Sequence, residues 1–424
     1  MKISIIADCH LNRALYKGVL DKKHTSLPFR TVDFMKAFDF IITQNIDSVK
    51  PDLIVIAGDV YDTYDPSNEV RAFFNHQLRR LVDAEIKALI LIGNHDICRK
   101  HHALSPVKSF NPKGVEIIEE PTLSIVGDKV LMLFPYSIKV ERGEILIKEQ
   151  FHQFINESKQ TIENDPRYAN KEVIFFGHFG VKGAVLKTYI SVSDEHLLTD
   201  KTVTPKKQHL NLSVNDIGLE DLESVNAKYI FLGDYHEHQV LPVKDRYVMY
   251  TGSIERTDMS EYDQIKGYIL YDDKHEEDQR MGKARFMEYP KCRPMIEFRG
   301  NTQEISKAIF DLPTKGVKEA IVKVAFVGNN KELLEFSTNL DEIRKQIKSK
   351  INPIHLYHQQ KVINEREEEE AHNLEEEIIE KGHLDEELVM RVVNEMIIEK
   401  ESDIEEQKEL MAIAADIYKE TMEE

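Results

Sequence analysis

The sequence has no apolar run long enough to cross a bilayer, so we expect no membrane-spanning segment. The apolar stretch near its start, residues 3–7, is too short for the core of a secretory signal peptide. Cysteine is also scarce: Cys9, Cys98 and Cys292 are odd in number, far apart and without the spacing of a metal site. Because stable disulfides are unusual in reducing compartments, this pattern predicts free thiols and a cytoplasmic protein.

The sequence also lacks an excess of basic residues, and its formal net charge is −19. Most of the acidity is concentrated at one end of the chain. Residues 361–424 hold 23 of the 75 acidic residues and 7 of the 56 basic ones, which leaves residues 1–360 with 52 and 49. The body is therefore nearly neutral. A phosphate-bearing substrate is not excluded, because metal ions could neutralise its charge.

A length of 424 residues predicts two or three domains. Up to about residue 140, buried-strand patterns alternate with helical periodicity, as in an α/β sheet; later strands have fewer helices between them, which predicts a layered, mixed sheet. The predicted strands cover residues 1–7, 52–57, 88–92, 130–134, 172–176, 228–232, 247–251 and 267–271, with helices at 31–49, from 66 and at 144–163.

After Pro290 the pattern restarts as a small βαβαβ unit, with strands at 295–299, 320–327 and 354–357 and helices at 302–312 and 331–349. From Glu365 the chain is helical and acidic, with apolar stripes too sparse for a core of their own. We therefore predict an α/β fold class with three parts: a layered catalytic domain at 1–285, a small α+β domain at 290–360 and a helical tail at 361–424.

Several predicted strands end in polar side chains of the kinds that bind metals. Any one of these ends could instead be a helix cap, a turn or a core histidine, and a glycine-asparagine-histidine loop is equally consistent with a surface turn. In α/β sheets, however, ligands collect at the carboxyl ends of strands, and five such ends are hard to explain separately. The candidate residues are Asp8, His10, Asp59, Asn94, His95, His178, His236 and His238.

Carboxylate and imidazole ligands without thiolates suit manganese, iron or zinc, with Mn²⁺ the natural choice. Two metal ions about 3.5–4 Å apart need a shared carboxylate, and Asp59 lies at the middle of the set. Such a pair would activate water for attack on a phosphate ester, while an imidazole near the leaving oxygen would help it depart. His236 and His238 can face the same side if their segment is extended.

In chain order, these residues resemble the motifs of the calcineurin-like metallophosphoesterases. Within that superfamily the chain is similar to the SbcD-type DNA double-strand-break repair nucleases, also through residues 58–63 and 251–256 and through the place of the βαβαβ unit, where that family has a DNA-capping domain. Archaeal and eukaryotic members often have a histidine three residues after the bridging aspartate. Asp62 stands there in this chain, which favours the bacterial or phage branch and a bacterial or host cytoplasm.

The resemblance implies roles for individual residues. One metal ion would be held by Asp8, His10, Asp59 and His238, and the other by Asp59, Asn94, His178 and His236. His95 would assist the phosphate and the leaving group without binding metal, and Asp96 would orient it. Cys9 is interpreted as a packing residue.

The implied function is a two-metal-dependent DNA nuclease, an exonuclease with single-strand or hairpin endonuclease activity. It would act on double-stranded ends and single strands, with a coiled-coil ABC ATPase of the SbcC type, as a homodimer within a heterotetramer and away from membranes. A phosphatase or cyclic-nucleotide phosphodiesterase of the same superfamily is the alternative enzyme; a scaffold without activity is disfavoured, because every expected ligand position is occupied.

More peripheral contacts are also implied, each with a plainer alternative. His101, His102, Arg344 and Lys348 are candidates for DNA contact, although basic residues of this kind often only face solvent. The tail is predicted to dock on the ATPase, with folding back onto its own body as the alternative. Its apolar contacts would be Leu388, Val392, Leu410, Ile413 and Ile417.

Overall fold

The structure is a computed structural model that describes residues 1–16, 19–21, 26–97, 106–109, 112–186, 208–209, 217–312 and 319–362. Several predicted contacts lie outside these residues: His101 and His102, and the tail positions Leu388, Val392, Leu410, Ile413 and Ile417. Among the helices within these ranges, none is long and apolar enough to cross a membrane.

Two six-stranded sheets form the larger part of the chain. The first consists of β1 (Lys2–Ile6), β2 (Leu53–Ala57), β3 (Lys87–Leu91), β4 (Val115–Ile118), β15 (Gly267–Asp272) and β16 (Ala284–Glu288). The second consists of β5 (Thr122–Val126), β6 (Lys129–Phe134), β7 (Glu172–His178), β12 (Tyr229–Gly233), β13 (Gln239–Leu241) and β14 (Tyr247–Tyr250). Their orders are β16-β15-β1-β2-β3-β4 and β13-β14-β12-β7-β6-β5.

Each sheet contains four strands that run parallel to one another. In the first sheet these are β1 to β4; β15 runs antiparallel to β1, and the edge strand β16 runs antiparallel to β15. In the second, β6, β7, β12 and β14 run parallel, with antiparallel β5 and β13 at the edges. Because parallel strands end at the same edge, their loops gather on one side of the molecule.

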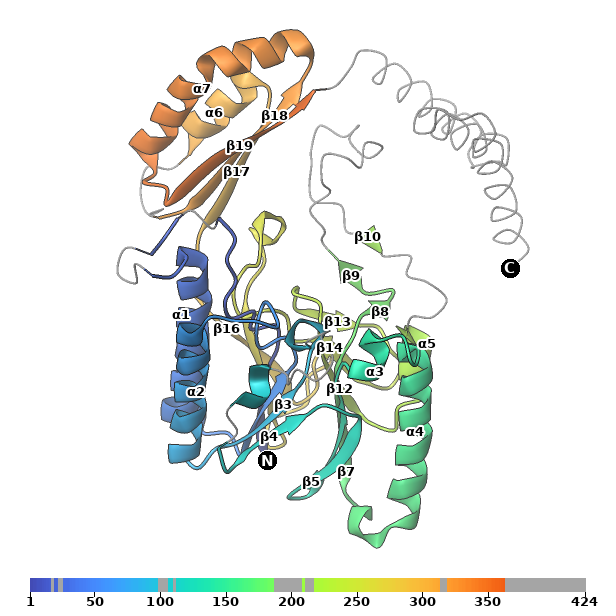
Figure 1. Ribbon diagram of the computed structural model, residues 1–424. Helices are drawn as coiled ribbons and strands as arrows, with labels where there is room; N and C mark the ends of the chain where they lie inside the picture. Colours follow the sequence, from blue (N-terminus) through green and yellow to red (C-terminus); the bar gives the residue numbers. More distant parts are fainter. Residues whose placement is uncertain are drawn as a thin grey trace, which may run out of the picture.

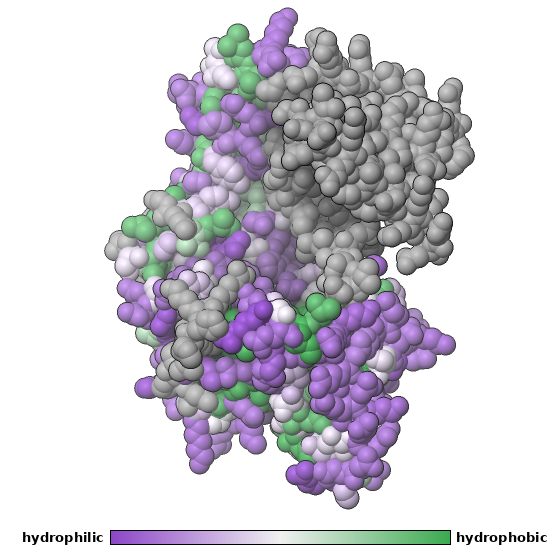
Figure 2. All heavy atoms as spheres, turned by 45° about the vertical axis from the view of Figure 1, so that its right-hand side comes forward, coloured by the Kyte–Doolittle hydropathy of each residue, from purple (hydrophilic) through white to green (hydrophobic). Residues whose placement is uncertain are grey.

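Apolar side chains alternate between two cores along each strand. Val55 packs between the sheets, whereas Ile54 and Ile56 face the helices α1 (Phe29–Gln44) and α2 (Asn68–Asp83). On the second sheet, α4 (Ile147–Asn164) covers the outer face (Figure 1). Over the described residues visible in Figure 2 the surface is mainly hydrophilic. The α/β/β/α layers confirm the predicted class, a layered mixed-sheet α/β fold.

Shorter elements connect these layers. They are the helices α3 (Ile138–Glu141) and α5 (Leu219–Leu222), the strands β8 (Val181–Lys182), β9 (Val185–Leu186), β10 (Gln208–His209) and β11 (Ile217–Gly218), a π-helical turn at Asn45–Val49, and 3-10 turns at Asn94–Asp96, Pro106–Ser109, Pro166–Tyr168 and Met259–Glu261. The helix expected at 31–49 therefore ends as α1 at Gln44 and continues as the π-helical turn.

A smaller α/β unit follows, with its own core. Its parallel strands are β17 (Met295–Gly300), β18 (Ile321–Gly328) and β19 (His355–Val362), and its helices are α6 (Thr302–Asp311) and α7 (Asn330–Lys350). Both helices begin at an asparagine cap that is completed by a glutamate three residues later. The sheet face away from these helices meets the larger part, where Met295 and Ile321 pack with Phe29 and Met259.

Candidate metal centre

The predicted site residues follow five parallel strands, β1, β2, β3, β7 and β12. Three of the loops turn at once through a residue in the left-handed region: φ is 48° at Asp8, 51° at Asp59 and 102° at Asp234. Non-glycine residues rarely adopt such angles, and aspartate tolerates them better than most. The sharp turns bring the polar side chains back over the ends of the strands.

Two glycines make room for the imidazole of His178. A Cβ at Gly58 would lie 2.0 Å from its Nδ1, and a Cβ at Gly233 would lie 2.8 Å from the same atom. The ring is fully buried, and its Nδ1–H donates to the carbonyl oxygen of Ala57 at 2.8 Å. His178 is therefore held between two loops, and its Nε2 is the atom directed at the site.

The Nε2 atom of His178 lies among oxygen atoms. It is 3.1 Å from Oδ1 of Asn94 and 3.4 Å from Oδ1 of Asp59. Burial opposes the charged imidazole, but the charge and hydrogen bond of Asp59 raise the pKa of His178 to about 10. In the metal-free protein a proton therefore occupies the place among these oxygens that a metal ion would take.

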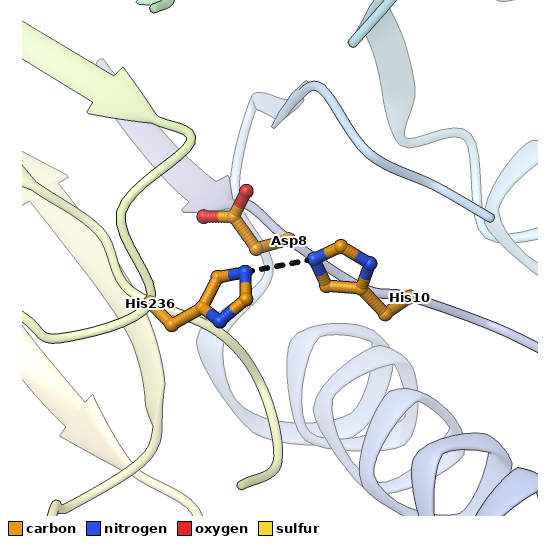
Figure 3. Close-up of side chains that lie close together, drawn as sticks. All are labelled: Asp8, His10 and His236. Carbon is orange, nitrogen blue, oxygen red and sulfur yellow. Dashed lines mark hydrogen bonds between the residues drawn. The ribbon is translucent and has the colours of Figure 1, made fainter. Parts of the chain in front are cut away.

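A second group contains Asp8, His10 and His236 (Figure 3). The Nε2 atoms of the two histidines face each other at 3.0 Å. Oδ1 of Asp8 accepts the backbone N–H of Asp234 at 3.0 Å, whereas its Oδ2 is buried without a hydrogen-bond partner. A buried carboxylate oxygen without a donor, next to two ring nitrogens, fits a divalent cation.

Asp59 connects these groups. Its carboxylate is close enough to share a cation with Asp8 and His178, and also with His10 and His95. Desolvation, caused by burial, raises the pKa of Asp8 to about 6. Burial acts on Asp59 in the same direction, but the neighbouring His178, His10 and His95 hold its pKa well below the usual range. The shared carboxylate is therefore ionised at neutral pH.

His238 is not gathered with the other candidates. Its Nδ1–H donates to the carbonyl oxygen of Tyr250 at 2.8 Å, and its ring stacks on Phe286 with centroids 4.4 Å apart. It belongs to none of the three clusters found among the described residues. The place expected for His238, beside Asp8 and His10, is taken by His236.

Asp234 lies at the place that was expected for His236, beside His178. Its Oδ1 lies 4.0 Å from Nε2 of His178. The reason is local: the backbone bends at residues 236 and 237 instead of staying extended, so the rule that residues i and i+2 share a face does not apply to His236 and His238. The sequence-based pairing of His236 with His178, and of His238 with Asp8, does not match this geometry.

Alanine substitutions should show that His236 binds a metal ion and that His238 does not. We expect His236→Ala to weaken Mn²⁺ binding by at least about tenfold, since it removes a nitrogen from the cluster, and His238→Ala to leave both the affinity and the stoichiometry unchanged. Isothermal titration calorimetry on the metal-free protein measures both quantities. Equal losses in the two variants would contradict the placement.

His95 lies at the open side of the site. Its backbone N–H donates to Oδ1 of Asp59 at 3.0 Å, and its Nδ1–H donates to the carbonyl oxygen of Asp62 at 2.9 Å. The side chain is 38% exposed and its Nε2 lies 3.9 Å from Oδ2 of Asp59. The ring is thus oriented by a backbone carbonyl, with Nε2 free to meet a substrate.

Asp96 has a different role from the one expected. Its buried carboxylate accepts three backbone N–H groups, from Val60 and Gly93 at 3.1 Å and from Tyr61 at 3.0 Å. These bonds fasten the loop after β3 to the loop after β2, and the orienting bond of His95 goes to Asp62 instead. Asp96 is therefore placed to hold the loops rather than the imidazole.

Three acidic residues near the site were not among the sequence candidates. They are Asp62, whose Oδ1 lies 3.3 Å from Nδ1 of His10, together with Asp234 and Glu261, whose Oε1 accepts from Nδ1 of His236 at 2.9 Å. Asp62 could have been found, since it is three residues from Asp59. Glu261 follows no strand and has no spacing signal.

The predicted basic contacts Arg344 and Lys348 lie on α7, which packs on the face of the small sheet turned away from the larger part. Arg344 is near Asp341 and His358, each at 3.3 Å, and Lys348 is exposed. The structure therefore does not bring either residue to the metal centre.

The chain resembles a known protein family and several known proteins. The family model for calcineurin-like phosphoesterases matches residues 1–239. The chain is 28% identical to a subunit of the nuclease SbcCD from Staphylococcus epidermidis over 282 residues, 64% of this chain and 66% of that protein. It is 21% identical to DNA double-strand break repair protein Mre11 of Methanocaldococcus jannaschii over 301 residues, 71% and 63% of the two chains.

Both alignments span less than two thirds of the relative's own length. Among solved structures, a putative 5'-nucleotidase from Staphylococcus aureus matches with a TM-score of 0.37 and 11% identity, covering 82% of this chain and 58% of that one. A TM-score of this size does not establish a common fold. The family match covers more than half of the chain and includes every strand end that forms the centre, so the chain belongs to the calcineurin-like phosphoesterase family.

Proposed function

We propose that this chain is a two-metal-dependent DNA nuclease. The observation that carries the proposal is the set of three overlapping ligand clusters, two of which contain Asp59, with the half-exposed His95 at their open side. The two curated relatives named above are a nuclease subunit and a DNA-break repair protein, which supports DNA as the substrate class.

We assign the ligands as follows. One ion would be held by Asp8, His10, Asp59 and His236, and the other by Asp59, Asn94, His178 and Asp234. This donor set of oxygens and imidazoles without thiolates suits Mn²⁺. When bound, two such ions supply Lewis-acid activation of water and neutralise the charge of a phosphodiester.

Side chains of the protein would supply the proton for the leaving oxygen and hold the catalytic loops in place. Because Nδ1–H of His95 is committed to the carbonyl of Asp62, the proton that His95 exchanges with a substrate sits at Nε2. That atom would donate to the leaving oxygen as its bond to phosphorus breaks. The hydrogen bonds of Asp96 keep the loops of Asp59 and His95 in register, which fixes the distance between the shared carboxylate and this proton.

The test is a comparison of substrates with Mn²⁺ present. End-labelled duplex DNA, a DNA hairpin and 4-nitrophenyl phosphate esters would be offered to the same preparation. We expect DNA to be cleaved and the small esters to react much more slowly. Rapid turnover of the esters with no cleavage of DNA would favour the alternative, a phosphatase or small-molecule phosphodiesterase.

We further propose that the chain works as a homodimer with a coiled-coil ATPase, in the cytoplasm of a bacterium or a phage host. The support is the name of the Staphylococcus epidermidis relative, which is one subunit of a nuclease complex, and the acidic, amphipathic sequence after residue 361. Removal of the residues after about 370 should abolish co-purification with the ATPase and leave basal cleavage intact. A complex that survives this deletion would place the docking site elsewhere.

Affinity for Mn²⁺ should rise with pH. His178, with its pKa raised to about 10 by Asp59 against the effect of burial, is protonated at pH 7 and must lose that proton to bind a metal ion. Each proton released makes the apparent affinity rise about tenfold per pH unit between pH 7 and 9. Calorimetry in buffers of different protonation enthalpy counts the released protons, and an affinity independent of pH would contradict the assignment of His178.

A further inference from the structure

A buried group of polar side chains lies behind His236, on the side of its ring away from the metal centre. Oε1 of Glu261 accepts Nδ1–H of His236 at 2.9 Å. Thr257 binds the same glutamate twice: its hydroxyl donates to Oε1, and its backbone N–H donates to Oε2 at 2.7 Å. Glu261 is 4% exposed and follows no strand of the site.

Lys266 completes this group. Its Nζ lies 2.7 Å from Oε2 of Glu261 and also donates to the carbonyl oxygen of His236 at 2.8 Å. Its remaining bonds go to Oγ of Ser253 at 2.9 Å and Oε1 of Gln264 at 2.7 Å. A buried ion pair with every hydrogen bond satisfied adds little net stability, but it fixes a geometry. Here both the ring and the backbone of His236 are held.

We propose that Glu261, held by Lys266, is the positioning residue that keeps the His236 imidazole with Nε2 directed into the metal centre. The proposal rests on the metal centre of the proposed function. With Nδ1–H committed to Glu261, the lone pair is at Nε2, the atom that faces His10 at 3.0 Å. A carboxylate behind a ligand histidine fixes the tautomer and the ring orientation and makes the ligand more basic.

Without Glu261, Nδ1 of the ring keeps only the hydroxyl of Thr257 at 3.0 Å, a group that can donate as well as accept and so does not fix which nitrogen carries the proton. A flip about the Cβ–Cγ bond, or a proton on Nε2, then competes with the metal ion for the ligand atom. The loss should fall on one ion, because the ligands assigned to the other, including His178 and Asn94, make no contact with Glu261 among the hydrogen bonds and ion pairs between the described residues.

The test measures Mn²⁺ binding to metal-free protein by calorimetry, with electron paramagnetic resonance to distinguish paired from single ions. In Glu261→Gln we expect one of the two ions to bind about 10- to 100-fold more weakly, with the other unchanged and the signal of the coupled pair replaced by that of a single ion. Asp258→Asn is the matched control, since this carboxylate is in the same loop and bonds to Ser260 instead.

A second variant separates ligand positioning from folding. Glu261→Gln leaves Lys266 buried without its charge partner, whereas Glu261→Gln with Lys266→Met removes both charges together. We expect the double variant to fold, as judged by circular dichroism and thermal unfolding, and still to bind one ion at least about tenfold more weakly. Wild-type affinity for both ions in either variant would overturn the proposal, as would equal weakening of both ions.

The outcome is independent of whether DNA is the substrate. If the wild type binds two Mn²⁺ ions but cleaves no DNA, the proposed function fails while the effect of Glu261 on the ions can still be read. If the wild type cleaves DNA and Glu261→Gln keeps both ions with full affinity, the positioning role fails and the nuclease assignment stands.

Discussion

We expect replacement of His95 by glutamine to lower Mn²⁺-dependent DNA cleavage by about 10²- to 10⁴-fold while two metal ions remain bound, because general acid catalysis contributes an effect of that size. Glutamine can retain a hydrogen bond to the carbonyl of Asp62, but it has no titratable proton to give to the leaving oxygen. Metal content should not change, since His95 is at the open side of the site and the ions have other ligands. Single-turnover cleavage of end-labelled duplex DNA measures the loss.

Substitution of the neighbouring Asn94 should impair metal binding instead of proton transfer. Asn94→Ala removes the oxygen that faces His178 at 3.1 Å, so we expect weaker binding of one ion and partial rescue of cleavage by high Mn²⁺. His152→Gln, on α4 beside Asp221 and outside the three clusters, is the control for histidine loss. Cleavage retained in His95→Gln, or rescue of that variant by added Mn²⁺, would show that His95 does not supply the proton.

Much of the fold was predictable from local pattern. Strands such as β2 and β7 are continuous apolar runs, because both faces of an inner strand are buried, and they are followed by a glycine and a polar side chain. The edge strands β4, β5, β13 and β16 were not predicted. Their side chains are partly exposed, so their apolar pattern is incomplete, and β13 has only three residues.

The candidate site was predictable as a set of strand ends but not in its details. The residues after Gly233 show why: Asp234, His236 and His238 are all plausible ligands, and the bends of the backbone between them decide which of them face the site. The same holds for Asp96, whose sequence neighbourhood suggests a partner for His95, whereas its carboxylate is fully used by backbone N–H groups. Contacts between distant loops, such as Glu261 with His236, leave no spacing signal in one sequence.

The carboxylates of the site lie close together and need positive charge near them. Asp8, Asp59 and Asp234 lie close to one another with few donors, and Oδ2 of Asp8 has none. Carboxylates gathered in this way repel one another unless a cation is shared between them. In the metal-free protein the proton on His178 meets part of this need. Two divalent ions would meet it more fully, and Asp59 is the residue that both of them would use.

Asp59→Asn should therefore be the most damaging single substitution at the centre. The amide keeps the shape of the side chain and can still accept the backbone N–H of His95, now at 3.0 Å, so the loops should stay in place. Its nitrogen cannot bind a metal ion, and the negative charge that attracts both ions is lost. We expect the bound Mn²⁺ to fall from two ions to at most one, and DNA cleavage to fall to the level of protein treated with a chelator.

Asp52→Asn is the matched control, because Asp52 immediately precedes the same strand and binds the backbone N–H of Lys2 at 2.7 Å, at the end opposite the site. Metal content by atomic emission and cleavage of labelled duplex would be measured on both variants after thermal unfolding confirms the fold. If Asp59→Asn retains two ions, the bridging role is wrong and each ion must be held by its remaining ligands alone. If it keeps one ion and loses all cleavage, the chemistry requires the pair, as a carboxylate that belongs to two of the three clusters implies.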